Sequence, residues 1–304
     1  MFYGQNNSFL NEEIRCGWGI SSTIKKVWAV QIDLIQVLLK ICDKYKLRCF
    51  AIFGTLLGAI RHKGYIPWDD DIDFGMPRKD YDIFIELCKN GVLNDPYFLQ
   101  TTISDIDSYE IHSSLRNSNT TGNCDFNMNK RCNNGIAIDI VPLDGVPSNY
   151  EKYRKYRRKI RFKSSLCNTF VNTVNKTFKA RLLRFLMHLF VPHFNYKKYF
   201  LQNEKKLREI DFDLSDKVSA VLIADNSAKE LFWSKIDFDK IIFVPFENII
   251  IPIPAGYDSI LKQTYGNYME FPPVNKRGDK HHIDYHPDIP YKEYCSKKYG
   301  VKYK

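Results

Sequence analysis

The chain has 304 residues and a formal net charge of +10, and 44% of its residues are hydrophobic. This length and composition fit a soluble globular protein of one large or two small domains. No apolar run is long enough to span a bilayer, which argues against a membrane-spanning protein. The first residues show no basic region followed by an apolar stretch, as a secretory signal would, so we expect a cytoplasmic protein. Its eight cysteines include no CxxC pair, so we expect reduced, mostly buried thiols rather than disulfides or a zinc site.

The first predicted elements are an irregular arm over residues 1–20 and an amphipathic helix from about residue 23 to residue 45. In the helix, apolar residues recur at steps of three and four. Residues 49–53 then predict a short buried strand that ends in a Gly-Thr turn, and residues 56–60 predict the start of a second helix. Free N–H groups and the helix dipole at such a start attract phosphate, and nearby cations add to the attraction, although the turn alone often serves only as a tight connection. The residues predicted to bind phosphate here are Gly54, Thr55, Arg61 and Lys63.

Acidic residues crowd the segment from residue 69 to residue 73, which leads into strand-like alternation. In an extended backbone Asp71 and Asp73 share one face, roughly 7 Å apart between Cα atoms. Two carboxylates at this spacing can converge on one hard divalent cation, and oxygen ligands favour Mg²⁺ or Mn²⁺ over zinc. An acidic turn that only contacts water is the alternative. The apolar residues that alternate with the carboxylates argue against it, because like charges beside a core are costly without a cation.

A helix is predicted over residues 78–89, and short strands are predicted over residues 98–102 and 111–117. Arg116 lies at the end of the second strand, where it is either a solvated arginine or a contact to a nucleotide. Residues 118–135 are rich in asparagine and predict a loop, which is either a substrate lid or an ordinary insertion.

Residues 136–141 alternate again and place Asp139 as a lone acid in an apolar strand. A carboxylate in such a strand is rarely left without a partner, so it either binds a metal or accepts strong hydrogen bonds. We favour the metal and predict Asp139 as a third ligand beside the paired carboxylates.

Residues 152–208 hold seventeen lysines and arginines and one acid, so this segment carries +16 and the rest of the chain −6. Aromatic and apolar residues interrupt the charges, and helices are predicted throughout. The segment fits peripheral contact with an anionic membrane, with a solvated basic face or a crevice for acceptor phosphates as alternatives.

The last predicted elements are a hairpin over residues 241–253 and a helix over residues 257–265. A basic turn then leads to His281 and His282. From the sequence pattern alone, paired histidines at such a place are expected to face solvent, but they can also contact phosphate or donate a proton.

The segment GTLLGAIRHKGYIPWDDDIDFGMPRKDY, residues 54–81, resembles the signature of the LicD family. Residues 115–121, 134–147 and 251–254 resemble further family segments, and the similarity covers most of residues 30–150 and 240–290. The resemblance implies a phosphotransferase with an α/β, nucleotidyltransferase-like mixed sheet flanked by helices, with a basic helical insertion. It maps Gly54-Thr55 onto the usual glycine turn, Asp71 and Asp73 onto the paired carboxylates, and Asp139 onto the third.

Type members of that family transfer phosphocholine from CDP-choline to a surface glycan. The resemblance therefore implies Mg²⁺ or Mn²⁺ as cofactor, a CDP-alcohol donor, a glycan or lipid-linked glycan acceptor, and no nucleic-acid partner. It also favours site positions for Arg116, His281 and His282. Aromatic faces hold quaternary ammonium groups, so Tyr65 and Trp68 are candidates for choline, although a tryptophan at this place more often anchors its loop.

We expect a catalytic core over residues 1–150, a basic insertion over 151–239 that faces the acceptor or the membrane, and a segment over 240–304 that completes the core. Donors carrying ethanolamine, glycerol or ribitol stay open as alternatives to choline. So does classical nucleotidyl transfer, in which the nucleotide half moves. A nucleic-acid-binding module is an alternative of another class, but no nucleic-acid motif accompanies the basic segment.

Overall fold

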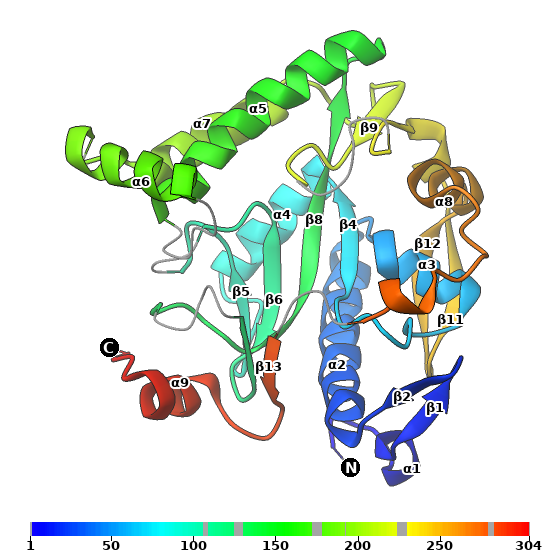
Figure 1. The fold of residues 1–304 in the computed structure, drawn as a ribbon. Coiled ribbons are helices and arrows are strands. Elements are labelled where there is room, and N and C mark those ends of the chain that lie inside the picture. The colour runs from blue at the N-terminus through cyan, green and yellow to red at the C-terminus, as the bar shows by residue number, and fades with distance from the viewer. Residues whose placement is uncertain are drawn as a thin grey trace.

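The structure is a computed structural model that describes residues 2–105, 109–124, 130–171, 178–191, 193–223, 230–278 and 283–303. Within these residues, seven strands form a mixed central sheet flanked by helices (Figure 1). This architecture confirms the predicted α/β fold with a mixed sheet. The strands of the sheet are β3 (Phe50–Ala51), β4 (Asp73–Pro77), β5 (Tyr97–Gln100), β6 (Ser113–Asn117), β8 (Ile136–Val146), β9 (Lys217–Ser219) and β10 (Trp233–Ser234).

Strand β8 lies at the centre of the sheet and makes it mixed. Its residues 139–143 pair in parallel with β4, while residues 136–140 pair with β6 and residues 144–146 pair with β9, both antiparallel. Strands β4, β6 and β8 therefore meet around Asp139, although they are far apart in the sequence.

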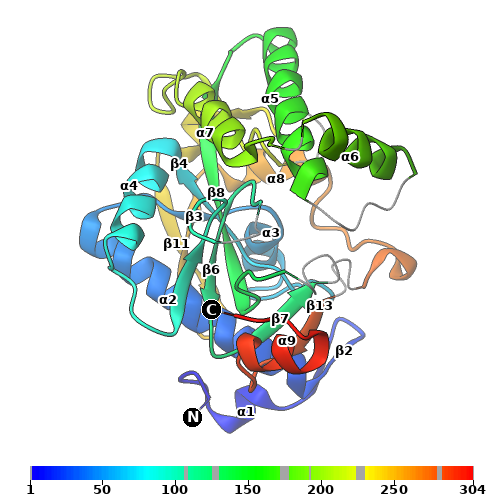
Figure 2. The ribbon, with the colours of Figure 1, turned by 90° about the vertical axis from the view of Figure 1, so that its left-hand side faces the viewer.

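Helix α2 (Ser22–Tyr45) runs along the sheet, as its periodicity predicts (Figures 1 and 2). It begins where the Ser21 side chain accepts a hydrogen bond from the Ile24 N–H, and it ends at Lys46 in the left-handed conformation. Its apolar stripe is buried against β6 and β8. The other helices of the core are α3 (Phe53–Arg61), α4 (Arg78–Lys89), α8 (Tyr257–Tyr265) and α9 (Tyr291–Tyr299).

The predicted basic insertion is helical, with α5 (Tyr150–Val171), α6 (Phe178–Phe190) and α7 (Tyr196–Leu207). These helices lie at one end of the molecule, and α6 lies at the outer end of the group (Figure 1). After α7 the chain returns to the central sheet as β9 and β10. Within the described ranges, none of the helices combines the length and the apolar character that crossing a bilayer requires.

Several local predictions differ from the structure. Helix α3 already begins at Phe53, so Gly54 and Thr55 lie in its first turn rather than in a turn before it. Strand β4 begins at Asp73, so Asp71 precedes the strand. The loop prediction for residues 118–135 is wrong at β7 (Thr121–Cys124), which pairs with the C-terminal β13 (Ile283–His286). A strand whose partner lies so far along the chain has little local signal.

The N-terminal arm also contains regular structure, α1 (Asn7–Leu10), β1 (Glu13–Arg15) and β2 (Trp18–Ile20). The C-terminal hairpin is confirmed as β11 (Ile241–Phe246) and β12 (Ile249–Pro254), and the described residues also include the 3₁₀ turns η2 (Lys235–Phe238) and η3 (Val274–Lys276). All eight cysteines are free thiols, and five of them are buried, as expected.

Candidate active site

A cluster of carboxylates lies where β4 and β8 run side by side. Asp73 and Asp139 are register partners in this parallel pair, so their side chains leave the sheet on the same face from strands roughly 4.8 Å apart. The Asp73 N–H donates to Thr55 Oγ1 at 2.8 Å, which fixes the start of β4 against α3. The sequence predicted both carboxylates, and the parallel register brings them together.

Asp69 and Asp71 complete the cluster. A Cβ on Gly54 would lie 2.8 Å from Asp69 Oδ2 and 3.8 Å from Asp71 Oδ1, so only glycine lets α3 approach these carboxylates so closely. Burial raises the pKa of Asp73 well above its usual range, and the negative charges of Asp71, Asp139 and Asp69 raise it further. The four carboxylates are therefore close enough to repel one another, and a cation among them would relieve that repulsion.

Asp139 has two neighbours that the sequence analysis missed. Its Oδ2 lies 3.0 Å from His112 Nε2, and its Oδ1 accepts a hydrogen bond from Ser114 Oγ at 2.6 Å. Burial alone would lower the pKa of His112, but the charge of Asp139 raises that pKa to about 8. Burial alone would raise the pKa of Asp139, but His112 is the main cause that lowers it to about 2. A signal was present, because His112, Ser114 and Arg116 alternate along one predicted strand and therefore share a face.

The charge of this pair makes the stability depend on pH. His112 has a higher pKa in the folded protein than its ordinary 6.5, so its contribution is full below pH 6.5 and is lost as the pH rises through 8. We expect the difference in free energy of unfolding between the parent and His112→Gln to shrink by about 2 kcal/mol between pH 6 and pH 9. Urea titrations in a metal chelator at several pH values measure this difference.

The matched control for that experiment is His286→Gln. His286 Nε2 lies 3.0 Å from Asp284 Oδ1, but both side chains are more than a third exposed, so their pairing is screened by water. A pH dependence that is the same in all three proteins would mean that the His112–Asp139 pair carries no such charge.

A cavity of about 280 Å³ opens beside the cluster. Arg116 lies in its wall, held by hydrogen bonds from Nε to Gln100 Oε1 at 2.6 Å and from Nη1 to the Gly135 carbonyl at 2.7 Å. These bonds present the guanidinium to the cavity, as a contact to phosphate or ribose requires. Polar side chains of the wall also come from α2, β6, β8 and the residues before β4 and within β13: Gln31, Asp70, Asp71, His112, Ser114, Asp139 and Tyr285.

The predicted phosphate-binding residues divide between two places. Gly54 and Thr55 lie in the first turn of α3, next to the carboxylates. Arg61 lies at the other end of this helix, where its Nη1 donates to the carbonyls of Tyr268 and Glu270. Lys63 is exposed beyond it, in the left-handed conformation. The structure therefore places Gly54 and Thr55 at the cluster, while the guanidinium of Arg61 is held at the other end of the helix and is affected by the charge of Asp69.

The two aromatic candidates also differ. Tyr65 is 3% exposed, stacks on Trp28 with ring centroids 4.4 Å apart, and donates its hydroxyl to the Trp28 carbonyl, so its ring belongs to the core. Trp68 lies in an aromatic cluster with Trp18, His62 and Phe271.

A cation already faces the ring of Trp68. The Arg277 guanidinium lies 4.6 Å from the centroid of that ring and 5.5 Å from the centroid of Phe271. This arrangement shows that the aromatic cluster can face a positive charge.

Tyr265 of α8 is another residue that the sequence analysis missed. The pKa of its hydroxyl is raised by burial and then by the charges of Asp73, Asp69 and Asp71, although 41% of the residue as a whole is exposed. Its hydroxyl therefore lies near the carboxylates. The predicted site residues His281 and His282 lie outside the described residues.

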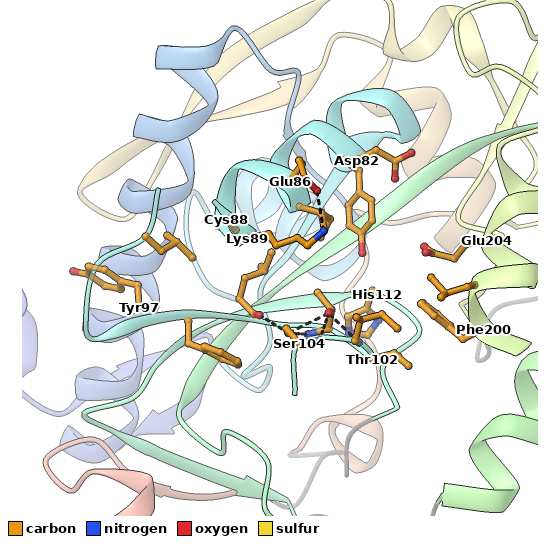
Figure 3. Close-up of a pocket in the computed structure, with 18 of the residues that line it drawn as sticks. Asp82, Glu86, Cys88, Lys89, Tyr97, Thr102, Ser104, His112, Phe200 and Glu204 are labelled. Atoms are coloured by element: carbon orange, nitrogen blue, oxygen red, sulfur yellow. Dashed lines mark hydrogen bonds and ion pairs between the residues drawn. The ribbon is translucent and has the colours of Figure 1, made fainter. Parts of the chain in front are cut away.

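A second, larger cavity of about 930 Å³ lies between α4, β5 and α7 (Figure 3). Its wall mixes apolar and aromatic side chains such as Phe98 and Phe200 with charged residues at α4 and α7. His112 lines this cavity as well as the smaller one. The two cavities therefore adjoin at the residue that contacts Asp139.

The carboxylate oxygens of the cluster suit a hard cation, although their side chains are not arranged in a complete coordination geometry. Among the described residues no three His, Cys, Asp or Glu side chains are arranged as a ready metal site. The carboxylates of Asp71 and Asp73 offer only oxygen, and the raised pKa of Asp73 marks negative charge that a cation would compensate. Each Asp139 oxygen keeps a second lone pair beside its contact to His112 or Ser114. The residues present therefore fit Mg²⁺ or Mn²⁺.

Comparison with known proteins agrees with this geometry. Residues 46–180 match the family domain described as LicD/FKTN/FKRP, nucleotidyltransferase domain. The chain is 28% identical over 266 residues to the lipopolysaccharide cholinephosphotransferase LicD of Haemophilus influenzae, covering 86% of this chain and 96% of that protein. A 27-residue stretch, 9% of this chain, is 63% identical to uncharacterized proteins of Rickettsia prowazekii and Rickettsia typhi, of which it covers 10% and 9%. By the domain match over residues 46–180 and by the relative of nearly equal length, the chain is similar to proteins of the LicD family.

Proposed function

We propose that this LicD-like transferase moves phosphocholine from CDP-choline to a hydroxyl of a glycan, with release of CMP. The observation that carries the proposal is the carboxylate cluster, in which the parallel register sets Asp73 beside Asp139 next to the first turn of α3. Its relative in Haemophilus influenzae is named as a cholinephosphotransferase that acts on lipopolysaccharide. A cytoplasmic location is part of the proposal.

The residues divide the chemistry between them. Asp71, Asp73 and Asp139 would hold Mg²⁺ or Mn²⁺, which supplies charge neutralisation at the diphosphate. Gly54 lets the first turn of α3 approach the carboxylates closely, so a phosphate held by a metal ion there would lie beside the start of this helix. Arg116, fixed by Gln100 and Gly135, contacts the nucleotide from the cavity wall.

The acceptor hydroxyl forms the new O–P bond as the bond between phosphorus and the CMP oxygen breaks. Its proton passes to a carboxylate of the cluster. Asp139, whose pKa His112 lowers to about 2, accepts a proton less readily than Asp73, whose pKa is raised by burial. The larger cavity adjoins the smaller one at His112, so an acceptor held there would lie one side chain away from Asp139.

A panel of CDP-alcohols tests the donor. We expect CMP release with CDP-choline, Mg²⁺ and an acceptor extract, and slower release with CDP-ethanolamine, CDP-glycerol and CDP-ribitol. Faster release of CMP from one of the other donors would mean that its alcohol, and not choline, is the transferred head group, and the proposed type of reaction would stand. No release with any donor would remove the proposal.

Trp68→Leu tests the head group. The ring already faces the Arg277 guanidinium at 4.6 Å, and we infer that a quaternary ammonium takes that position when the donor binds. Loss of the ring should weaken binding of CDP-choline relative to CDP-glycerol by roughly 3- to 30-fold, since such a contact contributes about 0.5–2 kcal/mol. Calorimetric titration with both donors measures the ratio.

Tyr65→Phe is the control for the head-group experiment, because it removes only the hydroxyl that bonds to the Trp28 carbonyl. Its preference between the two donors should equal that of the parent. If Trp68→Leu folds and keeps the parent's preference, Trp68 takes no part in recognition of choline.

A further inference from the structure

Helix α6 presents its apolar side chains to the outside of the molecule. Phe178, Phe185 and Phe190 are 79%, 63% and 74% exposed, and Leu189 is 59% exposed. The helix lies at the outer end of the α5–α7 group, away from the central sheet (Figures 1 and 2). These side chains therefore contribute little to the core.

Polar side chains of α6 contact α5. Arg184 Nε donates to the Phe170 carbonyl at 3.4 Å, and His188 Nε2 lies 3.2 Å from the same oxygen. The His188 ring also stacks on Phe170, with centroids 4.2 Å apart. Arg184 and His188 are one turn apart and share one side of the helix.

The apolar stripe lies on another side. Phe178, Leu182, Phe185 and Leu189 follow the spacing of one helical face, centred about 110° around the axis from Arg184 and His188 at 3.6 residues per turn. An amphipathic helix of a globular core turns its apolar stripe inward. In α6 the polar side contacts the protein, and the stripe faces outward.

The charge around the stripe is positive only. Helix α6 contains Lys179, Arg181 and Arg184 and no acid, and it lies within residues 152–208, which carry +16. Lys179 and Arg181 lie on either side of the stripe by their helical positions. Long basic side chains in such positions can reach headgroups while the apolar residues between them enter the boundary of the acyl chains.

We propose that α6 is an interfacial helix that lies flat in the headgroup region of an anionic lipid bilayer, with its apolar stripe toward the acyl chains. Thirteen residues are too few to cross a bilayer, so the helix lies along the surface. A second copy of the chain would bring one +16 segment against another, and this repulsion disfavours self-association there. Nucleic acid would satisfy the cations but would leave the apolar stripe in water.

The test is co-sedimentation with vesicles of phosphatidylcholine alone and of phosphatidylcholine with phosphatidylglycerol. The parent should pellet with the anionic vesicles at low salt, less at high salt, and much less with neutral vesicles. The variant Phe178→Ser, Phe185→Ser, Leu189→Ser should bind anionic vesicles at least tenfold more weakly. The matched control changes equally exposed apolar residues elsewhere, Phe243→Ser and Ile250→Ser, and should bind like the parent.

A second measurement does not depend on removing the stripe. Leu189→Trp should show a blue shift of its emission with anionic vesicles relative to the parent, and Phe243→Trp should show none. No pelleting of the parent, or equal pelleting of the parent and the α6 variant, would overturn the proposal. CMP release is followed separately, so a protein that binds vesicles but transfers nothing would refute the proposed function and leave this inference standing.

Discussion

Asp71→Asn and Asp73→Asn should each reduce turnover by about two orders of magnitude or more, through lost charge stabilisation at the reacting phosphate. Both proteins should fold. Because Asp73 lies among the charges of Asp71, Asp139 and Asp69, removing one carboxylate relieves repulsion, and the metal-free stability should stay equal or rise. Initial rates of CMP release at saturating Mg²⁺, together with urea titrations, measure the two effects.

The matched control for the carboxylate variants is Asp43→Asn. Asp43 lies near the end of α2 and lines neither cavity, and its exposed carboxylate pairs with Lys46 Nζ, at 3.1 Å. Its turnover should stay within severalfold of the parent. Near-normal turnover of both Asp71→Asn and Asp73→Asn would contradict the assignment of these residues to the metal.

Arg78→Met should lower the free energy of unfolding by about 3–5 kcal/mol, which is typical when one partner of a buried ion pair is removed. The Arg78 side chain is 4% exposed and joins three elements, because Nε contacts Asp144 Oδ1 of β8 at 2.6 Å and Nη1 contacts Glu204 Oε1 of α7 at 3.0 Å. Without the guanidinium, Asp144 stays buried without its ion-pair partner, and Glu204 keeps only Arg208, whose Nη2 lies 3.4 Å from its Oε2. Chemical denaturation at pH 7 gives the value.

Lys79→Met is the control for this stability prediction. Lys79 is the next residue of α4 and pairs with Asp211, but its side chain is 67% exposed, so its loss should change the stability far less. Equal losses in the two variants would show that the arginine is not what joins α4, β8 and α7.

The sequence singled out the carboxylates because their signal is local. Asp71 and Asp73 occur in one alternating segment, and Asp139 stands out as an acid in an apolar strand. Their convergence required the parallel register of β4 with β8, which no local pattern contains. The alternation of His112 and Ser114 marked a shared face, but not its partner. Ser114 meets Asp139 through the antiparallel register of β6 with β8, and His112 lies just before β6.

Composition predicted the basic helices, but the orientation of α6 could not be inferred from it. An amphipathic stripe in a sequence normally predicts which side faces the core. In α6 the contacts of Arg184 and His188 to Phe170 reverse that expectation. Tyr65 and Trp68 illustrate the same limit, because both are aromatic residues of one loop, yet one stacks in the core and the other joins a partly exposed cluster.

A doubly labelled donor shows which half of CDP-choline the protein transfers. CDP-choline labelled with ³²P on the choline-side phosphate and with ³H in the cytosine ring is incubated with the protein, Mg²⁺ and the acceptor extract. The account predicts ³²P on the glycan and ³H in free CMP, with both signals lost in Asp73→Asn. Tritium on the glycan would mean that the nucleotide moves, and transfer that persists in Asp73→Asn would mean that the carboxylate cluster is not the catalytic site.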